Sequence, residues 1–381
     1  MLTKQVPLGA LRSAQRKRQI MKKILLILLT LLFISVSNAY GIYNPQDLPN
    51  NKFGIHVLEQ SDLEDAVKLV NSKGGLWGYI TLVIRDDQRN LDQWAPFFKE
   101  LRQKHLIPLV RIATHVERDS WIKPNQDNVF AWVDFLNELP WPTKNRYIVL
   151  FNEPNHAKEW GGAINPSEYA QIANIFIKAL HKKSTEFYVL NSGFDLSASN
   201  IPGETADALW YWQQMEQEIP GIFKEFDGWT SHSYPNPGFS QNPYQSGRTS
   251  IVGYRFEQQY LTDNFGVAKK PVFLTETGWL INARLDENTV ASYYQIAFED
   301  IWTDSNLIAV TPFLLNYPEP LFASFSWKDK EGKPREQFNK VANLNKDEGK
   351  PELALVTLFG KTIEKIKNPS IKLTYIPDPL F

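Results

Sequence analysis

The chain has 381 residues, of which 43% are hydrophobic and 22% are charged, a composition typical of a globular protein and not of a disordered or fibrous one. Its 41 Lys and Arg residues balance 42 Asp and Glu residues, so the charge gives no reason to expect a nucleic-acid partner. The sequence has no cysteine, which excludes disulfides, thiolate metal ligands and a cysteine nucleophile.

The N-terminus has the pattern of a secretory signal. A basic start, Met21-Lys22-Lys23, precedes an apolar run over 24–36 that is too short to cross a bilayer comfortably, and small residues end at Ala39. We predict that residues 1–39 are a signal peptide, or else an uncleaved N-terminal membrane segment. In either case the single domain predicted for 40–381 lies outside the cytoplasm, secreted or membrane-anchored.

From residue 50 onward, short apolar runs alternate with longer amphipathic ones. The apolar runs predict strands, and the amphipathic runs between them predict helices. The predicted strands are 53–58, 78–85, 107–114, 146–152, 186–192, 226–233, 270–276 and 307–316. The predicted helices are 63–73, 91–104, 127–138, 167–183, 204–217, 251–263, 287–302 and 352–366.

The apolar runs are continuous, which is the pattern of a parallel sheet buried on both faces. Eight strand–helix units in one chain predict an α/β fold closed into a (β/α)8 TIM barrel. The alternative, an open doubly wound sheet, would have a Gly-rich phosphate turn after the first strand, and residues 56–63 contain no glycine. The charged segment 328–350 is predicted to be a solvated surface loop before the last helix.

Two of the predicted strands end on a glutamate. Residues 148–155 read IVLFNEPN and place Glu153 at the end of the fourth strand, while 271–279 read PVFLTETGW and place Glu276 at the end of the seventh. The carboxyl ends of barrel strands form the catalytic rim, so both side chains are expected at the barrel mouth. Two converging carboxylates, one protonated and one ionised, are what glycosidic bond cleavage requires.

An arginine near Glu276 would keep that carboxylate ionised. Arg85 ends the second strand and Arg111 lies within the third. We predict Arg85 as the partner of Glu276 and place Arg111 at the same rim, with an ordinary structural ion pair as the alternative for each.

Three short motifs lie at predicted strand ends: NEP at 152–154, HSY at 232–234 and TETGW at 275–279. Together they resemble the retaining glycoside hydrolases of the large (β/α)8 clan, which includes the cellulase-like family 5 and families 39 and 53. The resemblance implies that Glu153 is the acid/base and Glu276 the nucleophile. It also implies that Asn152 binds the sugar 2-hydroxyl, that Tyr234 contacts the nucleophile or substrate, and that His232 supports the acid/base. A rim histidine without a catalytic role and a strand-end turn residue remain the alternatives for His232 and Asn152.

Aromatic residues near the strand ends are candidates for sugar contacts, with burial in the core as the alternative for each. Trp279 follows the predicted nucleophile and is predicted to be a stacking platform. The other candidates are Trp160, Trp210, Trp212, His56 and His115. Many clan members place a tryptophan just after strand eight; here Tyr317 takes that place, or a loop brings Trp327 back to it.

The sequence therefore predicts a secreted retaining glycoside hydrolase acting on a β-linked oligo- or polysaccharide. The alternative is a non-catalytic glycan-binding surface protein on the same scaffold. Transglycosylation would use the same residues as hydrolysis. No cofactor is expected, and the sequence has neither an HExxH motif nor paired histidines on the first strand, so we predict no metal site.

Overall fold

The computed structural model describes residues 41–355. The chain divides into two compact units, Met1–Gly41 and Ile42–Phe381, and the described helices and strands belong to the second. The predicted signal segment and most of the predicted helix at 352–366 lie outside the described residues. Within residues 41–355, every helix is too short or too polar to span a bilayer.

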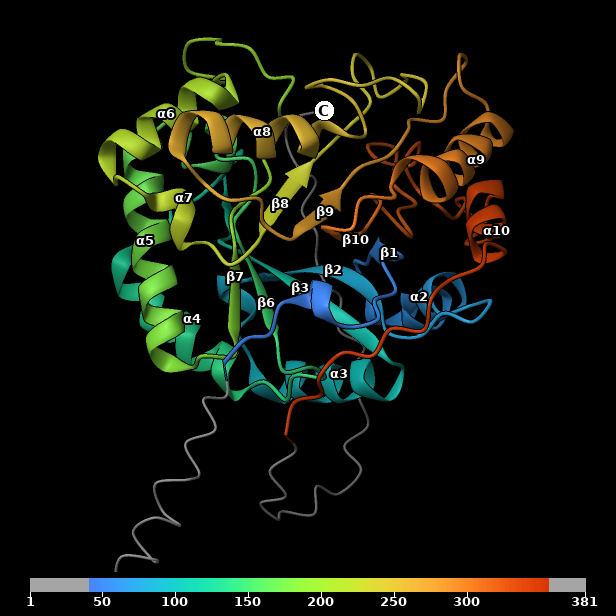
Figure 1. Cartoon of the computed structure of the whole chain (residues 1–381), viewed down its shortest axis with the longest axis horizontal. Helices are drawn as coiled ribbons and strands as arrows, with labels where there is room; N and C mark the ends of the chain where they lie inside the picture. Colours follow the sequence, from blue (N-terminus) through green and yellow to red (C-terminus); the bar gives the residue numbers. More distant parts are fainter. Residues whose placement is uncertain (1–40, 356–381) are drawn as a thin grey trace, which may run out of the picture. The chain divides into compact units, whose positions relative to one another are not determined.

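Eight parallel strands form the centre of this unit (Figure 1). Five of them make one sheet in the order β1-β2-β3-β6-β7, and three make a second sheet in the order β8-β9-β10. Parallel bridges Leu190↔Gly228 and Phe53↔Val310 join the two sheets at both edges and complete a ring. The predicted (β/α)8 barrel is confirmed. The strands are β1 Gly54–His56, β2 Gly78–Arg85, β3 Leu106–Ala113, β6 Arg146–Leu150, β7 Phe187–Leu190, β8 Trp229–His232, β9 Val272–Glu276 and β10 Leu307–Val310.

The strands are buried on both faces, as their continuous apolar runs predicted. β3 is buried along its whole length and pairs with β2 from Gly78↔Leu106 to Arg85↔Ala113. Inside the ring, Tyr79, Tyr147, Tyr188 and Phe273 pack ring against ring. The barrel is therefore filled by side chains at this level, and only its mouth is left for a site.

Helices cover the outside of the ring and pack apolar faces against the strands. Five of them begin at an Asn or Asp whose side chain accepts a backbone N–H of the first turn, which satisfies donors that a helix start leaves unpaired. The helices are α2 Leu63–Val70, α3 Leu91–Gln103, α4 Gln126–Glu138, α5 Pro166–Lys183, α6 Ala208–Glu218, α7 Ile222–Glu225, α8 Gly253–Phe265, α9 Glu287–Ile296 and α10 Glu336–Ala342. The 3-10 turns are η1 Pro45–Asp47, η2 Gln60–Asp62, η3 Asp86–Gln88 and η4 Ala157–Glu159, and η5 Ala297–Ile301 is a π-helical turn that continues α9.

The prediction that 328–350 is a solvated loop is wrong. This segment contains α10, which lies against α9 and α2 and buries Phe338 and Val341 (Figure 1). The charged residues lie on its outer face, while the apolar residues between them recur at helical spacing and enter the core. α10 thus occupies the place of the eighth helix, which was predicted at 352–366.

Both ends of the described chain lie at the N-terminal ends of the strands. The Ile42 backbone N–H donates to Thr185 O just before β7, and Leu353 forms a bridge with Thr143 just before β6. The loops at the opposite end carry the candidate site. One of them, directly after β3, contains a short antiparallel hairpin made of β4 (Val116–Glu117) and β5 (Ser120–Trp121).

Candidate active site

Glu153 lies just beyond β6, where the backbone leaves the strand. Phe151 and Glu153 have positive φ values of 71° and 23°, a region that non-glycine residues rarely adopt and that is enriched at functional sites. The Glu153 N–H donates to Gly193 O over 3.1 Å, which ties this turn to the segment after β7. The turn aims the carboxylate at the mouth of the ring, where it is 8% exposed.

Glu276 is the last residue of β9 and is also 8% exposed. Its Oε1 accepts from Arg111 Nη1 over 3.2 Å, and its Oε2 accepts from the Tyr234 hydroxyl over 3.2 Å. Arg111 Nη1 also donates to the side-chain oxygen of Asn152. Two predicted substrate-contacting residues, Asn152 and Tyr234, are thereby joined to the predicted nucleophile.

His232 lies between the two glutamates. Its Nδ1 is 2.7 Å from Glu153 Oε1 and 3.9 Å from Glu276 Oε2. The two carboxylate oxygens are therefore separated by roughly 6.6 Å at most, since that is the sum of the two distances. The sequence prediction that the two carboxyl groups meet over the barrel mouth agrees with this geometry.

The surroundings of Glu153 favour its protonated form. Burial raises the pKa of Glu153 above its ordinary value of 4.5, because the charged form loses its hydration. The hydrogen bond and charge of His232 act in the opposite direction but do not cancel the effect of burial. A carboxylic acid that keeps its proton at higher pH is suited to donate it to a leaving group.

The surroundings of Glu276 favour its ionised form. Burial acts to raise its pKa, but the charges of His232 and Arg111, with the Tyr234 hydrogen bond, outweigh burial and hold the pKa below 4.5. The same two carboxylates act on His232: burial lowers the pKa of the imidazole, and the charges of Glu276 and Glu153 raise it above 6.5 overall. The site thus contains one carboxyl group that is easily protonated and one that is easily ionised.

His232 is held in place by close packing against Gly193. A Cβ at position 193 would lie 2.1 Å from His232 Cδ2 and 2.3 Å from Nε2, closer than real Cβ contacts come. The glycine therefore makes room for the imidazole, while its carbonyl oxygen holds the Glu153 backbone. Gly193 was not among the predicted site residues, because a glycine after a strand is common in turns that have no role at a site.

The prediction that Arg85 is the partner of Glu276 is wrong. Arg85 Nε donates to Asp87 Oδ1 over 2.9 Å, a local ion pair just past the end of β2. Arg111, inside the neighbouring strand β3, reaches Glu276 instead. The reason is geometric: Arg111 is 3% exposed and points into the mouth, whereas Arg85 lies at the last position of its strand and turns to a carboxylate two residues away.

Trp279 is not a stacking platform. It is 1% exposed, donates from Nε1 to Gln241 O over 2.8 Å and packs edge-to-face with Tyr294. Trp160 and Trp212 are likewise fully buried in the core. Trp210 is 41% exposed on α6 and lines a separate surface hollow with Ile201 and Pro202.

Trp327 does not return to the mouth of the barrel. It is fully buried, and its ring centroid lies 4.6 Å from that of Tyr294. Tyr317 is 8% exposed and packs with Phe322 in an apolar cluster that also contains Tyr234. Of the two candidates after strand eight, Tyr317 is therefore the one that belongs to this cluster.

Of the two remaining histidines, one lies at the site. His56, on β1, is fully buried, and burial lowers its pKa to about 3, so it is neutral beside Glu276. His115 lies at the edge: its Nδ1 is 2.9 Å from Asp86 Oδ1, and this hydrogen bond raises its pKa. His56 can therefore accept or donate as a neutral ring, whereas His115 belongs to a surface cluster.

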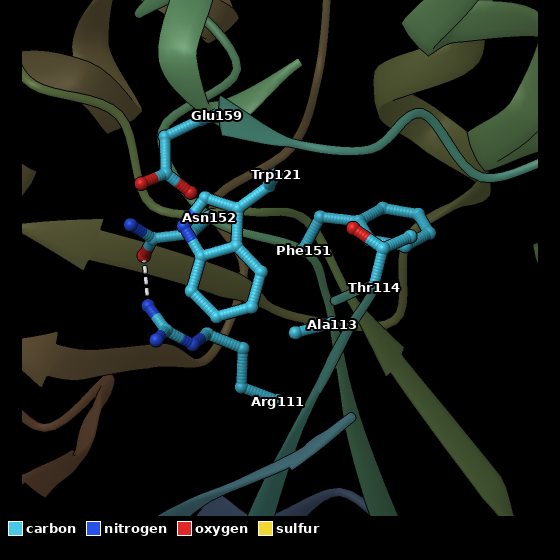
Figure 2. A pocket seen from close by; sticks show the side chains of 7 residues that line it. All are labelled: Arg111, Ala113, Thr114, Trp121, Phe151, Asn152 and Glu159. Carbon is cyan, nitrogen blue, oxygen red and sulfur yellow. Dashed lines mark hydrogen bonds between the residues drawn. The ribbon is translucent and has the colours of Figure 1, made fainter. Parts of the chain in front are cut away.

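A small hollow of about 10 Å³ opens beside the Arg111–Asn152 hydrogen bond (Figure 2). Seven residues line it: Arg111, Ala113, Thr114, Trp121, Phe151, Asn152 and Glu159. Trp121 and Glu159 were not predicted as site residues. Trp121 lies in a loop beyond the third strand and Glu159 lies six residues after Glu153, and neither spacing indicates a shared hollow before the chain is folded.

Within residues 41–355 no group of three or more His, Asp or Glu side chains is arranged to hold a metal ion. The described side chains at the mouth are two carboxylates, an arginine, an amide, a tyrosine and two imidazoles. Such a set can exchange protons and bind hydroxyl groups through its own atoms.

Comparison with known proteins identifies others that are similar to this chain in sequence or in fold. No protein-family model matches the chain. A curated protein, the putative mannan endo-1,4-beta-mannosidase 9 of Oryza sativa subsp. japonica, is 23% identical over 287 residues, covering 70% of this chain. The chain spans 60% of the length of that relative.

Two solved structures share the fold. The monomeric beta-xylosidase from Caulobacter crescentus CB15 has a TM-score of 0.56 at 12% identity, covering 77% of this chain and 68% of its own. GH5_18 from Streptomyces cattleya, solved in complex with GlcNAc, has a TM-score of 0.54 at 13% identity, covering 77% and 79%. The predicted resemblance to the cellulase-like glycoside hydrolase clan is confirmed at the level of the fold.

Proposed function

We propose that the protein is a retaining glycoside hydrolase that cleaves β-linked glycans by double displacement, with Glu153 as acid/base and Glu276 as nucleophile. The observation that carries the proposal is the opposite pKa shift of two buried carboxyl groups that flank one imidazole at the mouth of the barrel. Chemically identical groups acquire different roles when their surroundings separate their pKa values in this way.

In the first step, ionised Glu276 attacks the anomeric carbon while Glu153 gives its proton to the leaving glycosidic oxygen. A glycosyl ester on Glu276 and a free alcohol result. In the second step, Glu153, now ionised, takes a proton from a water molecule, whose oxygen attacks the anomeric carbon and releases Glu276. The configuration at that carbon is inverted twice and is therefore retained.

The neighbouring residues support these steps. Arg111 keeps Glu276 ionised and fixes the Asn152 side chain, which we propose as a contact of the sugar 2-hydroxyl. The Tyr234 hydroxyl holds Glu276 Oε2 and aligns the carboxylate for attack. His232 holds Glu153 and can share its proton during the switch from acid to base.

The substrate proposal follows the curated relative, whose name specifies a β-1,4-mannan. We propose β-mannan as the first polysaccharide to test, followed by xylan and cellulose. We also propose that residues 1–39 direct export, so that the enzyme meets such polymers outside the cell.

The test compares Glu153→Gln and Glu276→Gln with the wild type on aryl β-glycosides and on mannan. Glu276→Gln should lower kcat by at least about a thousandfold on every substrate, because no nucleophile remains. Glu153→Gln should lower kcat/KM, which reports the first step, by roughly 10²–10⁴ on mannan and much less on aryl glycosides whose leaving group needs no proton. NMR of the first-formed product should show a retained anomer.

Glu299→Gln, an exposed carboxylate on η5, is the matched control and should keep wild-type rates. Equal kcat values for Glu276→Gln and the wild type would contradict the assignment of the nucleophile. The alternative function, glycan binding without catalysis, would be indicated by wild-type protein that binds mannan but turns over no β-glycoside. A first-formed product with inverted anomeric configuration would indicate a single displacement instead of a double displacement.

A further inference from the structure

The hollow beside Asn152 has a wall that no step of the proposed reaction uses. That wall is the β4–β5 hairpin, and its residue facing the hollow is Trp121 (Figure 2). The hairpin is fixed to the strand-end loops around it. Trp121 O accepts from the Gly161 N–H over 2.8 Å, and the Thr114 hydroxyl donates to Ile122 O over 2.6 Å. The indole is therefore held in one place before any ligand arrives.

The indole N–H of Trp121 has no acceptor among the described residues, although the side chain is only 4% exposed. A buried donor without a partner costs free energy, and most buried indoles in the described part of the chain do have one: Trp94, Trp141 and Trp160 donate to Gln88 O, Leu136 O and Glu168 Oε2. Trp212 and Trp327 also lack an acceptor within residues 41–355, but both lie in the packed core. Trp121 differs from them because it borders a hollow that a ligand can enter.

The other walls of the hollow supply complementary groups. Glu159, on η4, is 6% exposed and presents its carboxylate on the same side as the Asn152 amide (Figure 2). Ala113 and Phe151 add apolar surface to the lining. The hollow thus offers one N–H donor, a carboxylate acceptor and apolar surface beside them, a combination suited to a sugar hydroxyl and the C–H group that carries it.

The size and charge of the hollow limit what it can take. Its volume of about 10 Å³ is close to the roughly 10–15 Å³ that one water molecule needs. The hollow can therefore receive a single hydroxyl group at the edge of a sugar, and not the ring itself. The one positive group in its lining, Arg111, is already engaged with Glu276 and Asn152. A carboxylate on the ligand would therefore meet Glu159 without a cation in the lining to offset the repulsion.

We infer that this hollow recognises one hydroxyl group of an uncharged sugar unit of the substrate, with Trp121 Nε1 as donor and Glu159 as acceptor, and that it excludes uronic acid units. The inference rests on the proposed function, and it deepens it by naming the substrate class as neutral β-glycans. Trp121 and Glu159 are then specificity-determining residues that contact the substrate without taking part in bond cleavage.

The test measures equilibrium binding in a Glu153→Gln background, which slows hydrolysis of the ligand and keeps the Glu276 carboxylate that engages Arg111. The probes are a β-1,4-linked mannose pentamer and the corresponding mannuronic acid pentamer, which differs by a carboxylate on each unit. Titration calorimetry should show binding of the neutral pentamer and at least tenfold weaker binding of the acidic one. Adding Trp121→Phe, which keeps an aromatic ring but removes the N–H, should weaken binding of the neutral pentamer about fivefold, the effect of one lost hydrogen bond.

Adding Glu159→Gln should weaken binding of the neutral pentamer less than Trp121→Phe does. It should raise the affinity for the acidic pentamer, because the charge that repels its carboxylates is gone. Phe130→Leu, at a 68% exposed position on α4, and Glu299→Gln are the controls and should change neither affinity. The Glu159→Gln measurement stands alone if Trp121→Phe fails to fold.

Failure of this inference is distinguishable from failure of the proposed function. Unchanged affinities in both Trp121→Phe and Glu159→Gln, or equal binding of the two pentamers, would overturn the inference even if the wild type hydrolyses mannan. Binding that follows the expected pattern in a protein without turnover would uphold the inference and reject the hydrolase. The inference would also be overturned if neither pentamer bound.

Discussion

Glu153 and Glu276 carry the same functional group, and the residues around them decide which one holds a proton. Loss of hydration is the main effect on the pKa of Glu153 and raises it. Glu276 also loses hydration, but the Arg111 charge and the hydrogen bond from the Tyr234 hydroxyl help to lower its pKa. The sequence motifs placed both glutamates correctly at strand ends. They could not show which arginine reaches Glu276, because that depends on how far along its strand each side chain starts and which way it turns.

These pKa directions predict a bell-shaped pH profile for kcat/KM. Glu276 must be ionised, so the rate falls as pH drops through its pKa, which lies below 4.5. Glu153 must be protonated, so the rate falls again as pH rises through its pKa, which lies above 4.5. Initial rates on a mannan oligosaccharide, whose leaving alcohol needs a proton, should show both limbs between about pH 3 and 9.

The alkaline limb can be assigned by a variant. Glu153→Gln cannot titrate at this position, so its residual activity on an activated aryl glycoside should stay level where the wild type declines. A decline at the same pH in Glu153→Gln would assign the alkaline limb to another group, of which His232 is the nearest.

Gly193 positions the acid/base through His232. In Gly193→Ala the new methyl group would overlap the imidazole, and the ring must shift away from Glu153. We expect kcat on mannan to fall by about tenfold or more, with a displaced alkaline limb in the pH profile, while far-UV circular dichroism stays unchanged.

Ser199→Ala, an exposed change in the same loop, is the control and should leave both rate and pH profile intact. If Gly193→Ala lowers kcat without moving the alkaline limb, Gly193 affects the site by a route other than Glu153.

At the scale of elements, the eight strands could be predicted from the sequence because burial on both faces leaves an unbroken apolar run that no other element of that length shows. The last described helix, α10, could not be predicted in this way. The segment 328–350 is so rich in Lys and Glu that its apolar residues, Phe338 and Val341, carry little weight in a composition-based interpretation. The hairpin after β3 was missed for another reason: it consists of two paired residues on each side, fewer than any periodicity can reveal.

The packing of α10 can be tested through Phe338, which is 5% exposed between α10 and its neighbours. Phe338→Ala should lower the free energy of unfolding by about 3–5 kcal/mol, since it removes a buried aromatic side chain and leaves a cavity. Urea denaturation followed by tryptophan fluorescence measures the change.

Phe130→Ala removes the same side chain from an exposed position on α4 and should change the free energy of unfolding by less than about 0.5 kcal/mol. Similar values for the two variants would mean that α10 contributes little to the stability of the barrel.

At the scale of the whole molecule, ring closure depends on short contacts between the first and last strands. The bridge Phe53↔Val310 is supported by the hydrogen bond from the His56 N–H to Pro312 O and by that from the Leu315 N–H to His56 O. This closure places His56 beside Glu276, so the catalytic mouth forms only when the ring is complete. A count of strand–helix units predicts the ring, but not the one-residue offsets in register that bring particular side chains together.

The predicted export segment leads to a prediction about the intact fold. The compact unit begins at Ile42, so a protein that starts at Tyr40 retains all of that unit. It should unfold in one cooperative transition at the same temperature as the full-length chain and hydrolyse the same substrates at the same rate. Differential scanning calorimetry of both forms measures this, and a lower midpoint for the shorter protein would show that residues 1–39 contribute to folding.

The positions of the two ends of the described chain have a further consequence. Ile42 and Leu353 are both bonded next to strand starts, and Glu153 and Glu276 lie at or past strand ends, so the chain enters and leaves at the pole opposite the reaction. A tether, a binding module or a solid support joined directly at residue 42 or residue 353 would hold the enzyme by its base. Its mouth would then face outward, toward a polymer too large to diffuse inside.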